Sequence, residues 1–310
     1  MAKRAFLIDT IWPARLSAGP DNMKNILLQT TIPHSPDGWS IERSSILAEV
    51  LWTIHDEVGR RLFSVTARNR ENLAPRDDRI LSRIDESEFD ELWLLGVDAG
   101  GGLGEGDCAA IGRFRQRGGA IFTSRDHQDL GISFCTLAGI GAANHFYSKN
   151  PEPDPARRAP DDIDTPQILW PNYHSGDNGG FQKVQATLPI HPIMRSSSNP
   201  SGCIDFLPAH PHEGAISVPE GEARRARVAA TGKSTVTGRP FNIAVVFNGN
   251  GAGRAVVDSS FHHLADYNLD PRRGCPSFVT EPCSSAILEN PQALADTKTY
   301  MENIARWLAG

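Results

Sequence analysis

The chain has 310 residues, and its 31 Lys and Arg against 37 Asp and Glu give a formal net charge of −6 at pH 7. This acidic balance argues against a protein that binds nucleic acid by neutralising phosphates. The 39% hydrophobic and 22% charged residues are typical of a globular chain, whereas 28 Gly and 22 Pro predict much irregular structure. No stretch approaches the roughly 20 apolar residues of a membrane span.

Targeting and redox signals favour a cytoplasmic protein. The apolar run near the N-terminus ends at Asp9, too early for the core of a signal peptide. The five cysteines are odd in number and form no CxxC pair, so a disulfide framework is not expected. We therefore expect a soluble chain with reduced thiols and no membrane partner.

Short apolar runs predict the buried strands of a mainly parallel sheet. Continuous rather than alternating hydrophobicity is typical of strands that helices cover on both faces. Helical spacing of apolar residues lies between and after these runs, which favours an α/β fold. The predicted strands are residues 5–8, 62–65, 92–97, 120–123, 243–247 and 255–257, and the predicted helices are residues 41–58, 105–117 and 291–308.

Two regions break this alternation. Residues 12–39 contain four prolines and are predicted to form a long connection. From about residue 150 to 240, Pro and Gly recur, and we expect a large insertion over the sheet with a small antiparallel sheet of its own. The expected organisation is a single domain over residues 1–310 that carries this insertion.

Ligands of open parallel sheets bind beyond the carboxyl ends of the strands, and this rule selects the candidate site residues. Asp9 follows the first predicted strand. Gly100, Gly101 and Gly102 follow the third, in a loop that matches neither a dinucleotide-binding nor a P-loop pattern. This loop offers backbone donors to a substrate, or is a plain strand-to-helix turn.

Ser124 ends the fourth predicted strand, where an elbow nucleophile would lie, although the flanking glycines of that motif are absent. A serine nucleophile needs a base within hydrogen-bonding reach, and His127, His262 or His263 could act as one.

Polar clusters hold six of the ten histidines. Imidazole and carboxylate groups in such clusters suit general acid/base catalysis or a divalent metal such as zinc, manganese or calcium. Alternatively, these histidines cap turns and helices. The expected catalytic residues are Ser124, Asp126, His127, Asp129, His262 and His263; the expected substrate-binding residues are Asp9, Gly100, Gly101, Gly102, His174 and Asp258; the candidate metal ligands are His210, His212 and Glu213.

Several segments, in their order along the chain, resemble the class I glutamine amidotransferase-like superfamily and its trehalose-utilisation (ThuA-like) branch. The resemblance implies a flavodoxin-like three-layer sandwich, elaborated here by long loops and the Pro/Gly-rich insertion. The segments are Gly118–Phe122, His191–Ile193, His210–Glu213, Gly251–Val257 followed by His262 and His263, and Asn303–Leu308.

This chain departs from the family at the elbow, where Ser124, Arg125 and Asp126 stand in place of the nucleophilic cysteine. We therefore expect a hydrolase-type enzyme that acts on a small polar substrate through a His/Asp cluster, with or without a metal. The alternative is a non-catalytic protein, which binds a sugar or another small molecule or serves as an assembly subunit. The expected partner is a small-molecule substrate, and a homo-oligomer stays open.

Overall fold

The computed structural model describes residues 23–71, 77–162 and 165–310. Within these residues, eight strands form one sheet in the order β2-β1-β3-β4-β12-β11-β10-β7. The strands from β2 to β12 pair in parallel, and β11, β10 and β7 extend the sheet with antiparallel pairs. Their bounds are β1 (Lys24–Thr30), β2 (Phe63–Arg68), β3 (Glu91–Leu95), β4 (Ala120–Ser124), β7 (Gln185–Ala186), β10 (Ala226–Lys233), β11 (Pro240–Phe247) and β12 (Ala255–Asp258).

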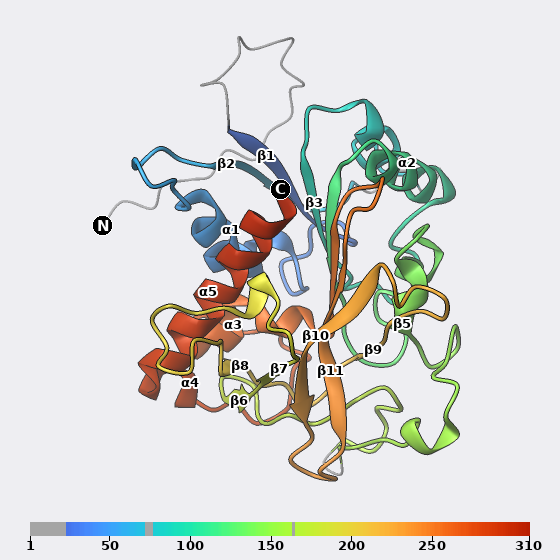
Figure 1. Ribbon diagram of the computed structural model, residues 1–310. Coiled ribbons are helices and arrows are strands. Elements are labelled where there is room, and N and C mark those ends of the chain that lie inside the picture. The colour runs from blue at the N-terminus through green and yellow to red at the C-terminus, as the bar shows by residue number, and fades with distance from the viewer. Residues whose placement is uncertain (1–22, 72–76, 163–164) are drawn as a thin grey trace.

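Helices cover both faces of this sheet, so the fold is the expected α/β three-layer sandwich (Figure 1). Helices α1 and α5 lie on one side and α2 on the other. The α2 segment and α5 fall where the sequence predicts them. The helices are α1 (Ser45–Trp52), α2 (Glu105–Gln116), α3 (Asp266–Leu269), α4 (Ala286–Glu289) and α5 (Pro291–Leu308).

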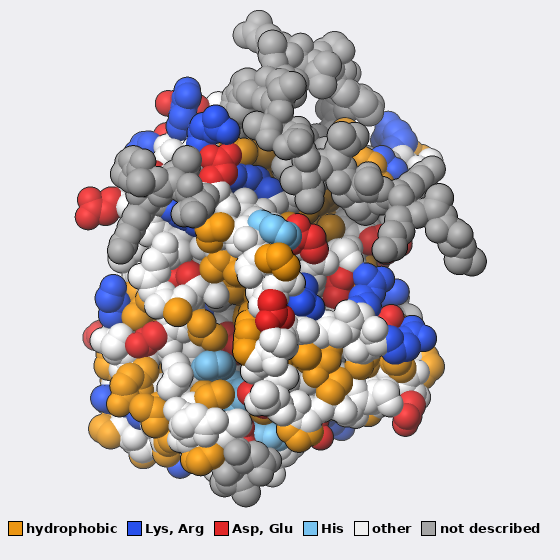
Figure 2. Space-filling view, turned by 180° about the vertical axis from the view of Figure 1, so that it is seen from behind, with side chains coloured by type: hydrophobic (Ala, Val, Ile, Leu, Met, Phe, Trp, Pro, Cys, Tyr) orange, Lys and Arg blue, Asp and Glu red, His pale blue; other side chains and the backbone are white. Residues whose placement is uncertain are grey.

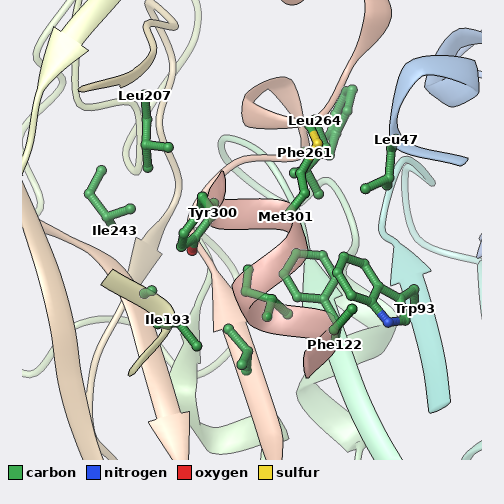
Figure 3. Close-up of a cluster of buried hydrophobic side chains, with 14 of the residues drawn as sticks. Leu47, Trp93, Phe122, Ile193, Leu207, Ile243, Phe261, Leu264, Tyr300 and Met301 are labelled. Carbon is green, nitrogen blue, oxygen red and sulfur yellow. The ribbon is translucent and has the colours of Figure 1, made fainter. Parts of the chain in front are cut away.

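The two hydrophobic cores follow from the alternation of side chains along β3 and β4. Trp93 and Phe122 point to the α5 side, where their rings stack with centroids 4.5 Å apart and Met301 packs in the same cluster (Figure 3). Leu92 and Ile121 point to the α2 side. Both faces of these strands are therefore buried, which explains their continuous hydrophobicity.

Three predictions are corrected within the described residues. The expected connection over 12–39 contains strand β1, because a proline-free apolar run lies between its prolines. The expected parallel strand at 243–247 belongs to β11 and runs antiparallel to β12. The helix expected over 41–58 begins with a 3₁₀ turn and ends at Trp52, because Asp56 accepts hydrogen bonds from Val58 and Arg60 and builds a turn instead. The predicted strand at 5–8 lies outside the described residues.

The insertion joins the main sheet rather than standing apart from it. Its strands β7 and β10 extend the antiparallel edge. Its other strands form two small antiparallel sheets, in which β5 pairs with β9 and β6 with β8. These strands are β5 (Asn144–His145), β6 (Phe181–Lys183), β8 (Phe206–Pro208) and β9 (Ala215–Ile216). No helix in the described part of the chain is long and apolar enough to cross a membrane.

A buried carboxyl group on β3 makes the stability of the fold depend on pH. Burial raises the pKa of Glu91 to about 8, and the indole N–H of Trp93 donates to its Oε2 at 2.9 Å. Between about pH 4.5 and pH 8 the folded chain therefore keeps a proton that the unfolded chain releases, so this group's contribution to stability falls as pH rises.

We predict that Glu91→Gln removes this contribution. The free energy of unfolding of the variant should rise relative to the wild type as pH increases, by at most about 1.4 kcal/mol per pH unit. Urea unfolding between about pH 5 and pH 8 measures the difference, with the exposed Glu57→Gln as control. A constant difference between Glu91→Gln and the wild type over this range would show that Glu91 is ionised in the folded chain.

Candidate functional site

The carboxyl ends of β4 and β12 bring the first half of the site together. The two strands are parallel neighbours, and Ser124 is the register partner of Asp258. The chain leaves β4 into Asp126 and His127, and it leaves β12 into a 3₁₀ turn over Phe261–His263. Parallel pairing therefore places residues more than 130 positions apart in sequence at one edge of the sheet.

The insertion supplies the second half. The segment between β8 and β9 carries His210, and it is held by backbone and side-chain hydrogen bonds from Ser175. Asp126, His127, His210 and His262 meet there, and we call these four residues the His/Asp cluster. His210 Nε2 lies 3.1 Å from Asp126 Oδ1, His262 Nε2 lies 3.5 Å from Asp126 Oδ2, and His127 Nε2 lies 3.7 Å from the same oxygen.

The rings of the cluster are fixed by their neighbours. The rings of His210 and His262 stack with centroids 3.6 Å apart and planes 9° apart. Trp39 packs edge-on against His262 at 4.8 Å, and His210 Nδ1 is 2.9 Å from Asn178 Oδ1. Each ring therefore keeps one orientation, with its Nε2 toward Asp126.

Burial sets the charges of this cluster. It lowers the pKa of His127 to about 4 and holds the pKa of His210 well below its usual value. Burial alone would raise the pKa of Asp126, but the facing imidazoles outweigh it and hold that pKa well below the usual range. Burial thus favours the neutral forms of His127 and His210 beside the Asp126 carboxylate, which leaves ring-nitrogen and carboxylate lone pairs available to a cation or a hydrogen-bond donor.

A polar pocket of about 270 Å³ lies on the far side of His212 from the cluster, and the four cluster residues are not part of its lining. His212 connects the two: its Nε2 is 2.7 Å from Asp162 Oδ2 in the pocket wall, and its ring contacts those of His210 and His127 at 5.4 and 5.2 Å. Histidine side chains reach the surface among neutral and hydrophobic groups on the face shown in Figure 2. The pocket is lined by Asp162, Thr165, Gln167, His174, Asp177, Pro211, Thr280, Glu281 and Pro282.

His263 belongs to a separate, fully buried network. Its Nδ1 is 2.9 Å from Asp258 Oδ1 and its Nε2 is 3.1 Å from Glu213 Oε1. Burial lowers the pKa of His263, but the two carboxylates outweigh this effect and raise it to about 10. Tyr300 donates to Asp258 and Gln182 donates to Glu213, so the network ties β12, the insertion and α5 together.

This network also explains where Ser124 and Glu213 lie. The hydroxyl of Ser124 donates to Asp258 Oδ1 at 3.0 Å rather than to an imidazole, so the arrangement is not that of a nucleophile and its base. Glu213, expected as a metal ligand beside His210 and His212, faces His263 instead. The cluster and the network share the loop after β12, but use its adjacent histidines separately.

The other predicted site residues make their hydrogen bonds with residues outside the His/Asp cluster. Asp129 accepts a hydrogen bond from the backbone N–H of Ser148. The backbone N–H groups of Gly100 and Gly102 donate to the side chain of Asp98, and Gly101 is exposed, so the loop binds its own carboxylate. His174 bonds Thr235 and lines the pocket. Asp9 lies outside the described residues.

Arg125, which follows Ser124 at the end of β4, fixes the turn that leaves this strand. It is fully buried, and its guanidinium donates to the carbonyls of Gln128, Leu130 and His145 and packs over the ring of Phe146. It fixes the loop that carries Asp126 and His127 against the insertion. It is therefore a positioning residue.

Sequence reasoning missed three neighbours of the cluster. Asn178, Asp162 and Trp39 lie in segments without strand or helix patterns. Nothing in the spacing of Asn178 or Asp162 points to His210 or His212, since these contacts form between loops of the insertion. Trp39 lies in the stretch predicted as a plain connection.

The fold and site together define a three-layer α/β protein whose polar centre lies at the carboxyl ends of adjacent parallel strands, with an insertion as the second wall. No protein-family model matches the chain, and no curated protein matches it. Among solved structures, it is similar to two proteins described as ThuA-like. The one from Bacteroides uniformis shares 11% identity at a TM-score of 0.46, covering 96% of this chain and 95% of that one. The one from Parabacteroides merdae shares 13% at 0.44, covering 93% and 90%.

The chain is also similar to the glutaminase domain of Trypanosoma brucei CTPS, at 14% identity and a TM-score of 0.43, covering 92% of this chain and 94% of that one. At such identities the likeness concerns the fold, and the site must be argued from its own residues.

We predict that His263 stabilises the fold and that its neighbour His262 contributes less. His263→Asn leaves two buried carboxylates without their shared cation, which should cost about 3–5 kcal/mol of unfolding free energy. His262→Asn is the matched control, because His262 is adjacent and also buried but does not lie between two carboxylates. Urea unfolding of both variants measures the difference. Equal losses would place the two histidines in one network.

Proposed function

We propose that the chain is a hydrolase-type enzyme that acts on a small polar substrate at the His/Asp cluster. The observation that carries the proposal is the convergence of Asp126, His127, His210 and His262, which His212 links to the polar pocket through Asp162. Three imidazoles around one buried carboxylate are costly to a fold, and groups with strongly shifted pKa values next to a pocket are typical of functional sites.

The roles follow from exposure and position. His127 is the most exposed member, with 18% of its side chain accessible, and it is placed to take a proton from an attacking water. The water's oxygen then bonds to the substrate's electrophilic atom, the bond to the leaving group breaks, and the proton passes to the leaving group. Asp126, with its low pKa, holds and orients the imidazoles.

The pocket favours a polar substrate. Asp162, Asp177 and Glu281 give its wall carboxylates, and Thr165 and Thr280 give it hydroxyl groups. A substrate with several hydroxyl or amino groups would find partners there, whereas an apolar one would not. Its volume suits a small molecule rather than a polymer.

We predict that His127→Ala lowers kcat by about 10²–10⁴-fold, the usual contribution of a general base. The measurement begins with a panel of 4-nitrophenyl esters, phosphates and glycosides and of simple amides, and continues with the substrate that is turned over. His34→Ala, an exposed histidine paired with Glu42, is the control and should retain wild-type kcat. Unchanged turnover in both His127→Ala and His262→Ala would contradict the assignment.

The second candidate is a binding protein without catalysis, and the closed elbow favours it. Arg125 is buried and engaged by three carbonyls, and no cysteine lies beside it to act as an amidotransferase nucleophile. This candidate predicts that a sugar or other small polar ligand raises the melting temperature saturably with no product formed. Detection of product excludes it.

A further inference from the structure

The contacts within the His/Asp cluster are not those of a hydrogen-bonded network. His210 Nε2 and Asp126 Oδ1 are 3.1 Å apart, yet among the described residues both are buried atoms without a hydrogen-bond partner, so the N–H direction does not fit the contact. His262 Nδ1 is likewise buried and unpartnered. Buried polar atoms that lie this close together without hydrogen-bond partners reduce the stability of the fold unless an ion or another polar group lies between them.

The contact at Nδ1 of His210 shows which ring nitrogen carries the proton. Asn178 Oδ1 is an acceptor, so the 2.9 Å contact places the proton of the neutral imidazole on Nδ1. The lone pair of His210 is then on Nε2 and faces the lone pairs of Asp126 Oδ1. A cation would turn this repulsion into two bonds. A carbonyl oxygen on the remaining ring N–H is also the arrangement that orients metal-binding histidines.

The distances have the scale of a coordination sphere. Ligand atoms about 2.1 Å from a tetrahedral ion lie about 3.4 Å from one another. Asp126 Oδ1 lies 3.1 Å from His210 Nε2, and Asp126 Oδ2 lies 3.5 Å from His262 Nε2. The rings of His210 and His262 stack with planes 9° apart, so binding of one ion by both Nε2 atoms requires one ring to turn from the orientation that it has here. One ligand atom from each of the three residues can be chosen so that all lie within 4.8 Å of one another.

We propose that Asp126, His210 and His262 bind one divalent first-row transition-metal ion, with zinc as the principal candidate. Two imidazoles and one carboxylate suit such a metal, whereas calcium prefers oxygen ligands. Three protein ligands leave one position of a tetrahedral ion open, and His127, the most exposed member of the cluster, lies 3.7 Å from the same carboxylate. The proposed ligands differ from the set His210, His212 and Glu213 that the sequence suggests, since Glu213 binds His263 and His212 binds Asp162.

The inference is tested on the full-length chain after removal of metal with a chelator. Titration with Zn²⁺, Mn²⁺, Fe²⁺ and Ca²⁺ against a chromophoric chelator gives affinity, and elemental analysis gives stoichiometry. We expect one Zn²⁺ per chain, weaker Mn²⁺ and no Ca²⁺ at matching concentrations. Co²⁺ in place of Zn²⁺ should give the intense visible absorption of a four-coordinate site.

Variants assign the ligands. Asp126→Asn, His210→Ala and His262→Ala should each lower zinc affinity by more than 100-fold, and Asn178→Ala by about 10–100-fold through the orientation of His210. His145→Ala is the matched control, since His145 is a buried histidine outside the cluster, and it should bind as the wild type does. Circular dichroism confirms that each variant is folded.

Two results would overturn the inference. One is a folded wild-type chain that binds no Zn²⁺, Mn²⁺ or Fe²⁺ near one equivalent. The other is wild-type affinity in folded His210→Ala and His262→Ala variants, which would place the ion elsewhere. A chain that binds one zinc ion but turns over no substrate supports this inference and contradicts only the proposed hydrolysis.

Discussion

The buried imidazolium of His263 is the interaction on which the rest of the structure depends. It lies between Asp258 at the end of β12 and Glu213 of the insertion, while Tyr300 of α5 bonds the same Asp258. One charged ring thus joins the sheet, the insertion and a covering helix in the absence of water. His262 of the His/Asp cluster is adjacent to His263, and His210 lies three residues before Glu213, so the structural network constrains the geometry of the cluster.

The adjacent residues His262 and His263 have different surroundings and different roles. His263 is charged and neutralised on both sides, whereas His262 stacks on a neutral His210 and faces a single carboxylate. The first arrangement is complete and suits stability. The second leaves buried nitrogen and oxygen atoms without partners, which a ligand, a proton or an ion can satisfy.

The sequence predicts the parts of the fold that local patterns determine. Apolar runs locate β3, β4 and β12, and the rule for carboxyl ends of parallel strands selects Asp126 and His262 before any coordinates are known. It does not locate the contacts of the insertion, because His210, Asn178 and Asp162 are brought together by loops with no periodicity. It also assigns Glu213 to the wrong neighbours, since the run His210-Pro211-His212-Glu213 does not show which of its three polar side chains faces which network. The turn at Asp56 shortens a helix because a side-chain contact overrides helical spacing.

The buried Arg125 has a consequence for engineering. Its side chain is buried and its donors bond three carbonyls, so the shape of the loop after β4 depends on this residue. Replacing Arg125 with cysteine would remove its hydrogen bonds to the three carbonyls, and the new thiol would lie in a loop that had lost these contacts. A cysteine nucleophile therefore cannot be introduced at this position by one substitution; the loop from Gln128 to His145 would have to be redesigned with it.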